Sequence, residues 1–214
     1  MLKIVLTGGS GSGKTAIQRV IQQSFGDQVL PVRELASEVL RDFNCAVGSM
    51  EPATIKRVQH EIYVRQKGRE QEACEPAPAV ARVLLLDRGT IDGAAYWPEG
   101  PEAFWTAMGT SHAAELTRYD AAVWLETAAA VGLYPGDVSN QLRKEGADDA
   151  VAHGDRILTL WQPHPNLTIV RAFPDFDIKV QTVVTIIRKL VDRAATATSV
   201  GPVVSRQLLS NPSK

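Results

Sequence analysis

The sequence predicts an α/β fold with three α/β/α layers, in which helices cover both faces of a five-stranded, mostly parallel sheet. Three observations support this prediction. The 214 residues suffice for one α/β domain with a substantial core. Five short apolar runs typical of strands alternate with helical stretches, which implies parallel strands joined by right-handed crossovers. The first run leads straight into a glycine-rich loop and then a helix.

The first predicted elements enclose a phosphate-binding motif. A strand over 2–6 and a helix over 16–21 flank a G-x-x-x-x-G-K-T pattern, Gly8-Gly9-Ser10-Gly11-Ser12-Gly13-Lys14-Thr15. Strand, loop and helix in this order are the context of a P-loop, not of a plain Gly/Ser turn. Its glycines let backbone N–H groups turn towards phosphate oxygens, and the helix N-terminus adds the positive end of its dipole. We expect ATP or GTP to bind here, with Lys14 on the outer phosphates and the Thr15 hydroxyl on Mg²⁺.

The middle of the chain supplies two further strands. The second is predicted over 29–33, where Pro31 favours an edge position, and a helix over 34–43 follows it. A long, highly charged helix starts near Pro52 and extends to about residue 72. The third strand, over 82–87, is a near-continuous apolar run that ends at Asp87, as central parallel strands often do.

The remaining strands are predicted over 121–126 and 167–170, with helices over 147–161 and 178–191. Ligands of such sheets bind at the carboxyl ends of the strands. We expect a single kinase-like domain over 1–194, with a lid at about 127–144. A tail over 195–214, rich in Ser, Thr, Ala and Pro, is expected to be mobile or loosely docked.

The composition of the chain limits the kinds of binding partner that we expect. The net charge of −1 gives no strong field for nucleic acid or an anionic membrane, so no nucleic-acid partner is expected. No apolar run is long enough to span a bilayer and no signal peptide is evident, so we expect a cytoplasmic protein. The two cysteines, Cys45 and Cys74, lack metal-type spacing and are expected to be reduced, partly buried thiols. A homodimer is compatible with the sequence.

Several classes of P-loop protein are disfavoured by missing motifs. The chain has no N-K-x-D segment of a switch GTPase, and its third strand ends in Asp87-Arg88-Gly89, not in the Asp-Glu of motor ATPases. No transporter-type signature loop is found either. The remaining layout is that of small-molecule kinases, with a carboxylate after the second strand, Asp-Arg after the third and an arginine-bearing lid after the fourth.

The segment after the third strand carries a family resemblance. The run Asp87-Arg88-Gly89-Thr90-Ile91-Asp92-Gly93-Ala94-Ala95-Tyr96 resembles the D-R-G-x-x-D-x-x-A-Y pattern of the NadR/Ttd-like AAA family. The resemblance covers roughly residues 2–191 and implies a P-loop fold like that of nucleotide kinases. This family groups with the ribosylnicotinamide kinase domain of NadR and includes proteins reported to bind GTP and phosphoinositides. More distantly, the chain is similar to thymidylate and deoxynucleoside kinases, which usually have Ser or an aromatic residue where this chain has Gly89.

Three candidate residues follow from the strand ends. Asp87 is expected to hold Mg²⁺, usually through water, or to cap its strand. Arg88 either lies near the phosphates or the acceptor, or forms an internal ion pair with Glu34 or Asp87. Glu34 either accepts the proton of an attacking hydroxyl, as related kinases imply, or is a glutamate of a helix first turn favoured by the dipole.

Further candidates lie in helices and in the lid. Asp92 faces an acceptor group or caps a short helix, sharing a helix face with Tyr96. Arg143 of the lid closes on the triphosphate or is a solvated surface residue, and Arg156 is a weaker candidate. Gln66, with Arg65, reads the acceptor or belongs to a charged helix face.

Two functions remain open at this point. The leading hypothesis is a kinase that uses ATP and Mg²⁺ to phosphorylate a small hydroxylated, nucleoside-like metabolite. The alternative is a regulatory module that binds GTP or ATP, hydrolyses it slowly and engages a protein or lipid partner.

Overall fold

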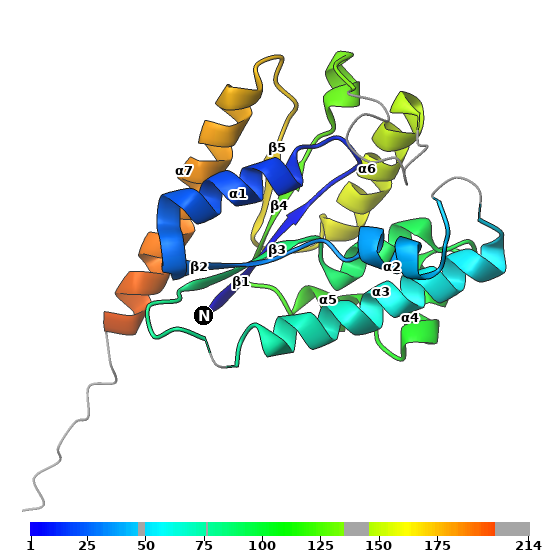
Figure 1. The fold of residues 1–214 in the computed structure, drawn as a ribbon, viewed down its shortest axis with the longest axis horizontal. Helices are drawn as coiled ribbons and strands as arrows, with labels where there is room; N and C mark the ends of the chain where they lie inside the picture. The colour runs from blue at the N-terminus through cyan, green and yellow to red at the C-terminus, as the bar shows by residue number, and fades with distance from the viewer. Residues whose placement is uncertain (47–49, 76, 135–145, 200–214) are drawn as a thin grey trace, which may run out of the picture.

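The computed structural model describes residues 1–46, 50–75, 77–134 and 146–199 (Figure 1). Arg143, most of the predicted lid and the tail beyond residue 199 therefore lie outside the described residues. Five strands form one sheet in the order β2-β3-β1-β4-β5, and every neighbouring pair is parallel. They are β1 (Leu2–Thr7), β2 (Val29–Val32), β3 (Val83–Asp87), β4 (Ala121–Leu125) and β5 (Leu167–Val170). The three-layer prediction is confirmed, with a sheet that is parallel throughout.

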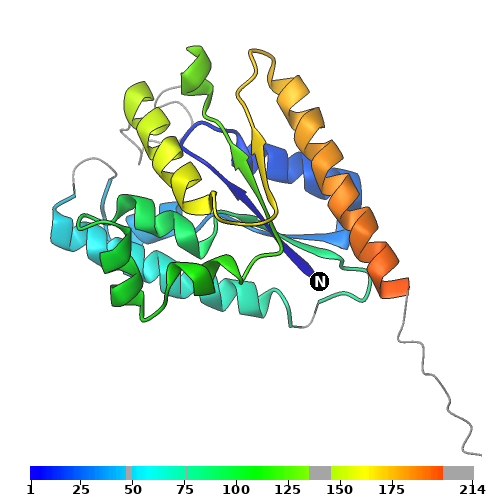
Figure 2. The same ribbon diagram turned by 180° about the vertical axis from the view of Figure 1, so that it is seen from behind.

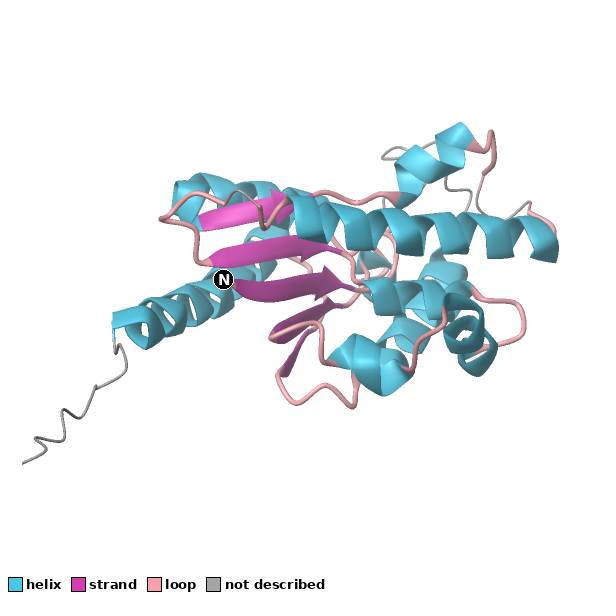
Figure 3. Cartoon of the chain, turned by 90° about the horizontal axis from the view of Figure 1, so that it is seen from below, coloured by secondary structure: helices cyan, strands magenta, loops and turns pink. Residues whose placement is uncertain are grey.

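The strand order brings the predicted site to one edge. β1 lies between β3 and β4, and Leu6 is in register with Asp87. The carboxyl ends of the strands point to the same edge of the sheet (Figure 3). β2 is an edge strand, as Pro31 predicts, since an edge position tolerates the missing backbone N–H.

One face of the sheet is covered by α1 (Lys14–Phe25) and α7 (Phe176–Ser199), as Figure 2 shows. Ile17 and Ile21 of α1 meet Val183 and Ile187 of α7 in a fully buried cluster that includes Ile4. α7 extends beyond the predicted 178–191 in both directions, so residues 195–199 of the predicted tail are helical. Aspartate capping at its start (Asp177 N to Asp175 Oδ1, 2.8 Å) and an Ala-rich end favour this longer helix.

The other face carries a layer of six elements of very different lengths around Trp124, Trp161 and Phe104. α2 starts two residues later than predicted, which leaves Glu34 in the loop before it. Three short elements of this layer were not delimited from the sequence: η2, α4 and α5. Within the described residues, no helix is both long and apolar enough to cross a membrane. The layer consists of α2 (Ala36–Asp42), α3 (Pro52–Glu72), η2 (Thr90–Tyr96), α4 (Pro101–Met108), α5 (His112–Leu116) and α6 (Ala147–Trp161), with η1 (Gly26–Gln28) and η3 (Ala128–Val131) as connections elsewhere.

Candidate functional site

The glycine-rich loop between β1 and α1 has a conformation that requires glycine. Gly8 has φ +129°, and a Cβ there would lie 2.2 Å from the carbonyl oxygen of Leu125. Gly13, the N-cap of α1, has φ +87°, and a Cβ there would lie 2.5 Å from the Phe176 ring. Side chains at these positions would clash or strain the backbone, so the glycines of the motif serve its shape.

The outer carbonyls of this loop are held by donors from other elements. Because a trans peptide points C=O and the following N–H in opposite directions, holding these oxygens outwards turns the next amides inwards. Inward N–H groups at a helix start form a concave anion site. The bonds are Thr127 Oγ1 to Ser10 O (2.6 Å), Ala128 N to Gly11 O (3.2 Å) and Lys179 Nζ to Ser12 O (2.8 Å).

Lys14 is folded onto the loop that it follows. Its Nζ donates to Gly8 O (3.0 Å), Gly9 O (2.8 Å) and Ser12 Oγ (2.9 Å), and the residue is 6 % exposed. A buried ammonium among neutral oxygens is well placed to exchange these acceptors for phosphate oxygens, which bear the opposite charge.

Thr15 and Asp87 form a pair that suits Mg²⁺. The Thr15 hydroxyl donates to Asp87 Oδ2 (2.8 Å), and Asp87 is 1 % exposed at the end of β3. The other carboxylate oxygen, Oδ1, is buried and has no hydrogen-bond partner in the described part of the chain. An orphaned carboxylate oxygen beside a hydroxyl matches the oxygen donors that Mg²⁺ binds. The residues present therefore fit the predicted metal.

Arg88 lies between the loop and η2 in a strained backbone conformation, with φ +80°. Its Nη1 lies 3.4 Å from Gly8 O and 3.6 Å from Asp92 Oδ2, so the internal ion pair is with Asp92 and not with Glu34 or Asp87. Its buried Nε has no hydrogen-bond partner among the described residues. Burial lowers the pKa of Arg88, but the nearby Tyr96, Asp92 and the other acids raise it above its ordinary value overall. Arg88 is therefore a fixed cation beside the loop.

The buried carboxylate of Asp92 connects three elements through hydrogen bonds. It accepts hydrogen bonds from Thr7 Oγ1 (2.8 Å) and Trp161 Nε1 (2.7 Å), which joins β1, η2 and α6. It does not cap its helix, because Gly89 is the N-cap and no side chain bonds there. Burial raises the pKa of Asp92 above its ordinary value, against the opposing effect of Arg88.

Tyr96 does not share a face with Asp92, because η2 is a 3-10 helix, in which residues three apart are aligned. Its half-buried ring packs against His153, with 4.8 Å between the ring centroids and a tilt of 34° between the ring planes. Glu34 precedes α2, and its Oε2 accepts the Ser37 N–H at 3.3 Å. Glu34 therefore accepts a backbone N–H of the first turn of α2 although it lies before that helix. It also lines the same pocket as Asp87.

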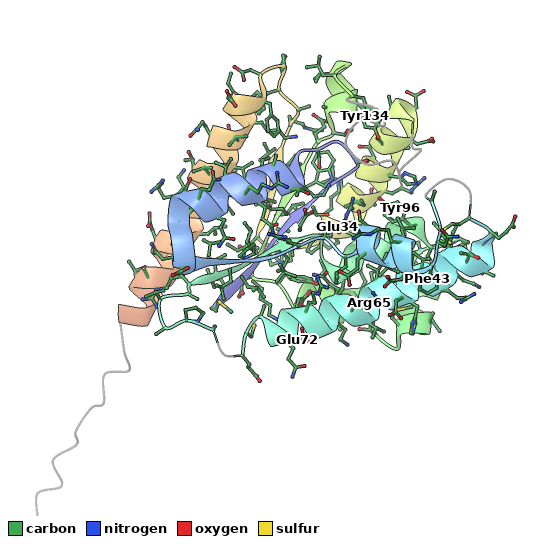
Figure 4. The ribbon with its side chains drawn as sticks, in the orientation of Figure 1. Glu34, Phe43, Arg65, Glu72, Tyr96 and Tyr134 are labelled. Carbon is green, nitrogen blue, oxygen red and sulfur yellow. The ribbon has the colours of Figure 1, made fainter. Side chains whose placement is uncertain are left out.

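Two pockets meet at Asp87 and Arg88. The nucleotide pocket, about 800 Å³, is lined by the P-loop, Glu34, Tyr134 and the segment 172–174 after β5. A second pocket, the chamber, of about 500 Å³, lies on the α3 and α6 side of the same two residues. Figure 4 marks the two regions by Tyr134 and Tyr96 respectively. Both volumes suit small molecules.

The chamber has an apolar lining with a few polar groups. Gln66 is 3 % exposed, and its Nε2 donates to Arg88 O and to Glu70 Oε1, both at 3.2 Å. Gln59 is 9 % exposed, and its side-chain amide makes no hydrogen bond to any described residue. Arg65, by contrast, does not line the chamber and pairs with Glu38, Asp42 and Glu61. The apolar part of the lining includes Leu35, Leu40, Met50, Val58, Ile62 and Trp97, and its polar rim includes Asp149, His153 and the exposed Arg156.

The structure adds site residues that sequence reasoning missed. Lys179, Thr127 and Tyr134 line or hold the nucleotide pocket, and Gln59 lines the chamber. One signal was available for Lys179, since it falls four residues before Val183 on the apolar face of its helix. Phe173, after β5, packs against the core and also lines the nucleotide pocket. No cluster of three or more His, Cys, Asp or Glu residues suited to a metal occurs in the described ranges.

Comparison with known proteins agrees with this geometry. A family described as "AAA domain" matches residues 3–175. The chain is similar to the NadR protein solved in complex with NR (TM-score 0.66, 15% identity, 89% of this chain and 52% of that one). It also resembles the deoxyadenosine kinase from M. mycoides solved with dATP bound (TM-score 0.55, 12% identity, 87% of this chain and 100% of that one). At these identities the likeness shows the fold alone.

A second NadR structure, solved in complex with NAD and AMP-PNP, gives a TM-score of 0.61, and the match covers 49% of that chain. The chain therefore spans about half the length of the NadR chains that it matches. Comparison with curated protein sequences gives no match. The resemblance to a NadR-like P-loop kinase fold, drawn from the Asp87 to Tyr96 run, is confirmed.

Proposed function

We propose that this chain, which belongs to the AAA-domain family, is an ATP-dependent kinase that phosphorylates a small hydroxylated metabolite. The observation that carries the proposal is the junction of two pockets at Asp87 and Arg88. A donor phosphate in the P-loop and an acceptor in the chamber would meet at these residues. A protein that only held a nucleotide would not need the second chamber.

Each residue has a proposed part in binding or transfer. The inward amides of the P-loop and Lys14 bind the phosphates of ATP, and Arg88 lies where charge develops on the transferred group. Asp92 acts as a positioning residue by holding Arg88. Arg143, outside the described residues, would close over the triphosphate as a lid arginine.

Phosphoryl transfer needs positioning more than strong base chemistry. The acceptor oxygen forms a bond to the γ-phosphorus while the bond from that phosphorus to the β,γ-bridging oxygen breaks, which releases ADP. Glu34, beside Asp87 in the nucleotide pocket, is proposed to orient the acceptor hydroxyl and to take its proton. Mg²⁺ held by Thr15 and Asp87 would supply charge neutralisation on the phosphates.

The acceptor is proposed to extend along α3. Gln66 touches the Arg88 carbonyl, and Gln59 lies seven residues earlier on the same helix, about 10 Å away along its axis. A buried amide without a partner leaves hydrogen-bonding capacity for a ligand. We therefore infer an acceptor with its hydroxyl at Arg88 and a polar group on its far, otherwise apolar end.

Incubation with ATP, Mg²⁺ and a metabolite extract, followed by mass spectrometry, tests this function. The expected result is an ATP-dependent product that is heavier than its precursor by one phosphoryl group and absent with Lys14→Met. Slow release of inorganic phosphate without any phosphorylated acceptor, in a protein that binds ATP normally, would instead favour the regulatory module.

A further inference from the structure

The first turn of α7 reaches the P-loop from the side opposite the chamber. Lys179 is 3 % exposed, and its Nζ donates to two backbone oxygens, Ser12 O (2.8 Å) and Glu126 O (2.6 Å). One turn earlier, the Phe176 ring lies against Gly13. The same lysine therefore joins the P-loop, the end of β4 and α7.

The Ser12 contact acts on the phosphate-binding amides. Ser12 O and Gly13 N–H belong to one peptide unit, so a donor on the oxygen directs the N–H the opposite way. Gly13 has φ +87° and begins α1, where amides bind anions. Lys179 also lines the nucleotide pocket and brings a positive charge to it.

We propose that Lys179 is a positioning residue of the nucleotide site, which holds the Ser12–Gly13 peptide for phosphate binding and adds a cation that strengthens triphosphate and diphosphate binding. This role concerns nucleotide binding and does not depend on the kinase reaction.

The surroundings of Lys179 make this role dependent on pH. Burial lowers its pKa to about 8, while the negative charge of Glu126 at the end of β4 opposes that effect. The Glu126 side chain is itself bonded to Arg171 after β5 (2.9 Å). The other charged residues that line the same pocket as Lys179 are Lys14, Arg19, Arg33, Glu34, Asp87 and Arg88.

A bound polyphosphate favours the charged form and raises the pKa of Lys179 in the complex. The binding free energy that this raised pKa adds is present in full below the pKa that Lys179 has in the free protein. It is lost as the pH rises through the pKa that Lys179 has in the complex. Nucleotide affinity should accordingly fall as pH rises above about 8. The ionisation of the nucleotide itself does not contribute to this pH dependence, because the last phosphate proton is lost near pH 6.

The test is calorimetric titration with ADP and Mg²⁺ between about pH 7 and about pH 9, where each unit of pKa shift is tenfold in affinity. For the wild type, Kd should rise by about tenfold across this range. Lys179→Met should bind at least about tenfold more weakly at the lower pH and show no such rise, while Lys179→Arg should keep affinity and lose the rise.

Lys189→Met, an exposed lysine on the same helix, is the matched control and should behave as the wild type. Circular dichroism confirms folding of each variant. A wild-type Kd that stays constant with pH, or a Lys179→Met protein with the wild-type affinity or the wild-type pH profile, overturns the proposal. ADP binding involves no phosphoryl transfer. The result therefore tests the role of Lys179 even if the protein proves not to be a kinase.

Discussion

Asp87 has two oxygens in different surroundings: Oδ2 accepts from Thr15, and Oδ1 is buried without a partner among the described residues. Asp87→Asn keeps the shape and removes the charge. We expect the Kd for Mg²⁺, titrated at a fixed concentration of a non-hydrolysable ATP analogue, to rise by about tenfold or more, because bonds to a charged group contribute about 1.5–3 kcal/mol.

Asp120→Asn is the control for this substitution. Asp120 precedes β4 at the opposite edge of the sheet and accepts the Lys3 N–H. Its removal should leave Mg²⁺ binding unchanged. Equal Mg²⁺ affinity in the wild type and in Asp87→Asn would show that Asp87 does not hold the metal.

Sequence reasoning reaches some residues of the site and misses others for a physical reason. The P-loop residues and Asp87 are identified by local order, since strand, loop and strand end are contiguous in the chain. Lys179 and Ser12 are 167 positions apart, so only the fold brings them together. The partner of Arg88 was likewise misplaced, because η2 turns Asp92 back towards it.

At the scale of elements, α3 forms one wall of the chamber, and we propose that it recognises the acceptor. Gln59→Leu keeps a side chain of similar size and removes the amide. Once an acceptor is identified, we expect its KM to rise by about tenfold to a hundredfold with little change in the KM for ATP, since an unpaired buried polar partner costs about 1–3 kcal/mol.

Gln71→Leu lies on the exposed side of the same helix and serves as the matched control. It should leave both KM values unchanged. An unaltered acceptor KM in Gln59→Leu would remove Gln59 from the chamber's recognition surface.

Long periodic elements could be predicted, whereas short ones could not. The five strands, α3 and α6 were expected within one or two residues of their bounds. The strands and α6 have continuous apolar patterns, whereas the highly charged α3 is marked by Pro52 in its first turn. α4, α5 and η2 span only five to eight residues and owe their form to tertiary packing around Phe104 and Trp161. These short elements help to form the chamber, so its existence was not visible in the sequence.

At the scale of the whole molecule, a buried ionic cluster joins α3 to α5 and to the loop before β4, and reaches Lys3 of β1 at the sheet. Arg118 Nη2 lies 2.6 Å from Glu70, and its Nε lies 3.4 Å from Glu115. Both glutamates are almost fully buried, and Tyr63 donates its hydroxyl to Glu115 at 2.8 Å. Burial, with that bond, raises the pKa of Tyr63 to about 12.

Arg118→Leu removes the nearest cation from two buried carboxylates. Among the described residues these carboxylates keep neutral donors such as Tyr63 and Gln66, and Glu70 keeps Lys3 at 3.7 Å. We expect the free energy of unfolding, measured in urea, to fall by about 3–5 kcal/mol, because an uncompensated buried charge is costly. Arg65→Leu removes a half-buried arginine of α3 that pairs with carboxylates near the surface, and it should cost much less. Similar losses in the two variants would contradict the cluster's structural role.

The order of the strands was also beyond the sequence, although their parallel direction followed from alternation with helices. This order places β1 beside β3, and thereby places Thr15 beside Asp87 and the P-loop beside the chamber. The proposed kinase site is a consequence of this arrangement.

The most direct test of that site is a crystal structure with Mg²⁺ and a non-hydrolysable ATP analogue. We predict that the γ-phosphate lies at the junction of the two pockets in contact with Arg88, that Mg²⁺ is held by Thr15 and Asp87, and that the chamber opens onto the γ-phosphate. A γ-phosphate directed away from Arg88 towards solvent, with the chamber closed off from it, would contradict the assignment of this chain as a kinase.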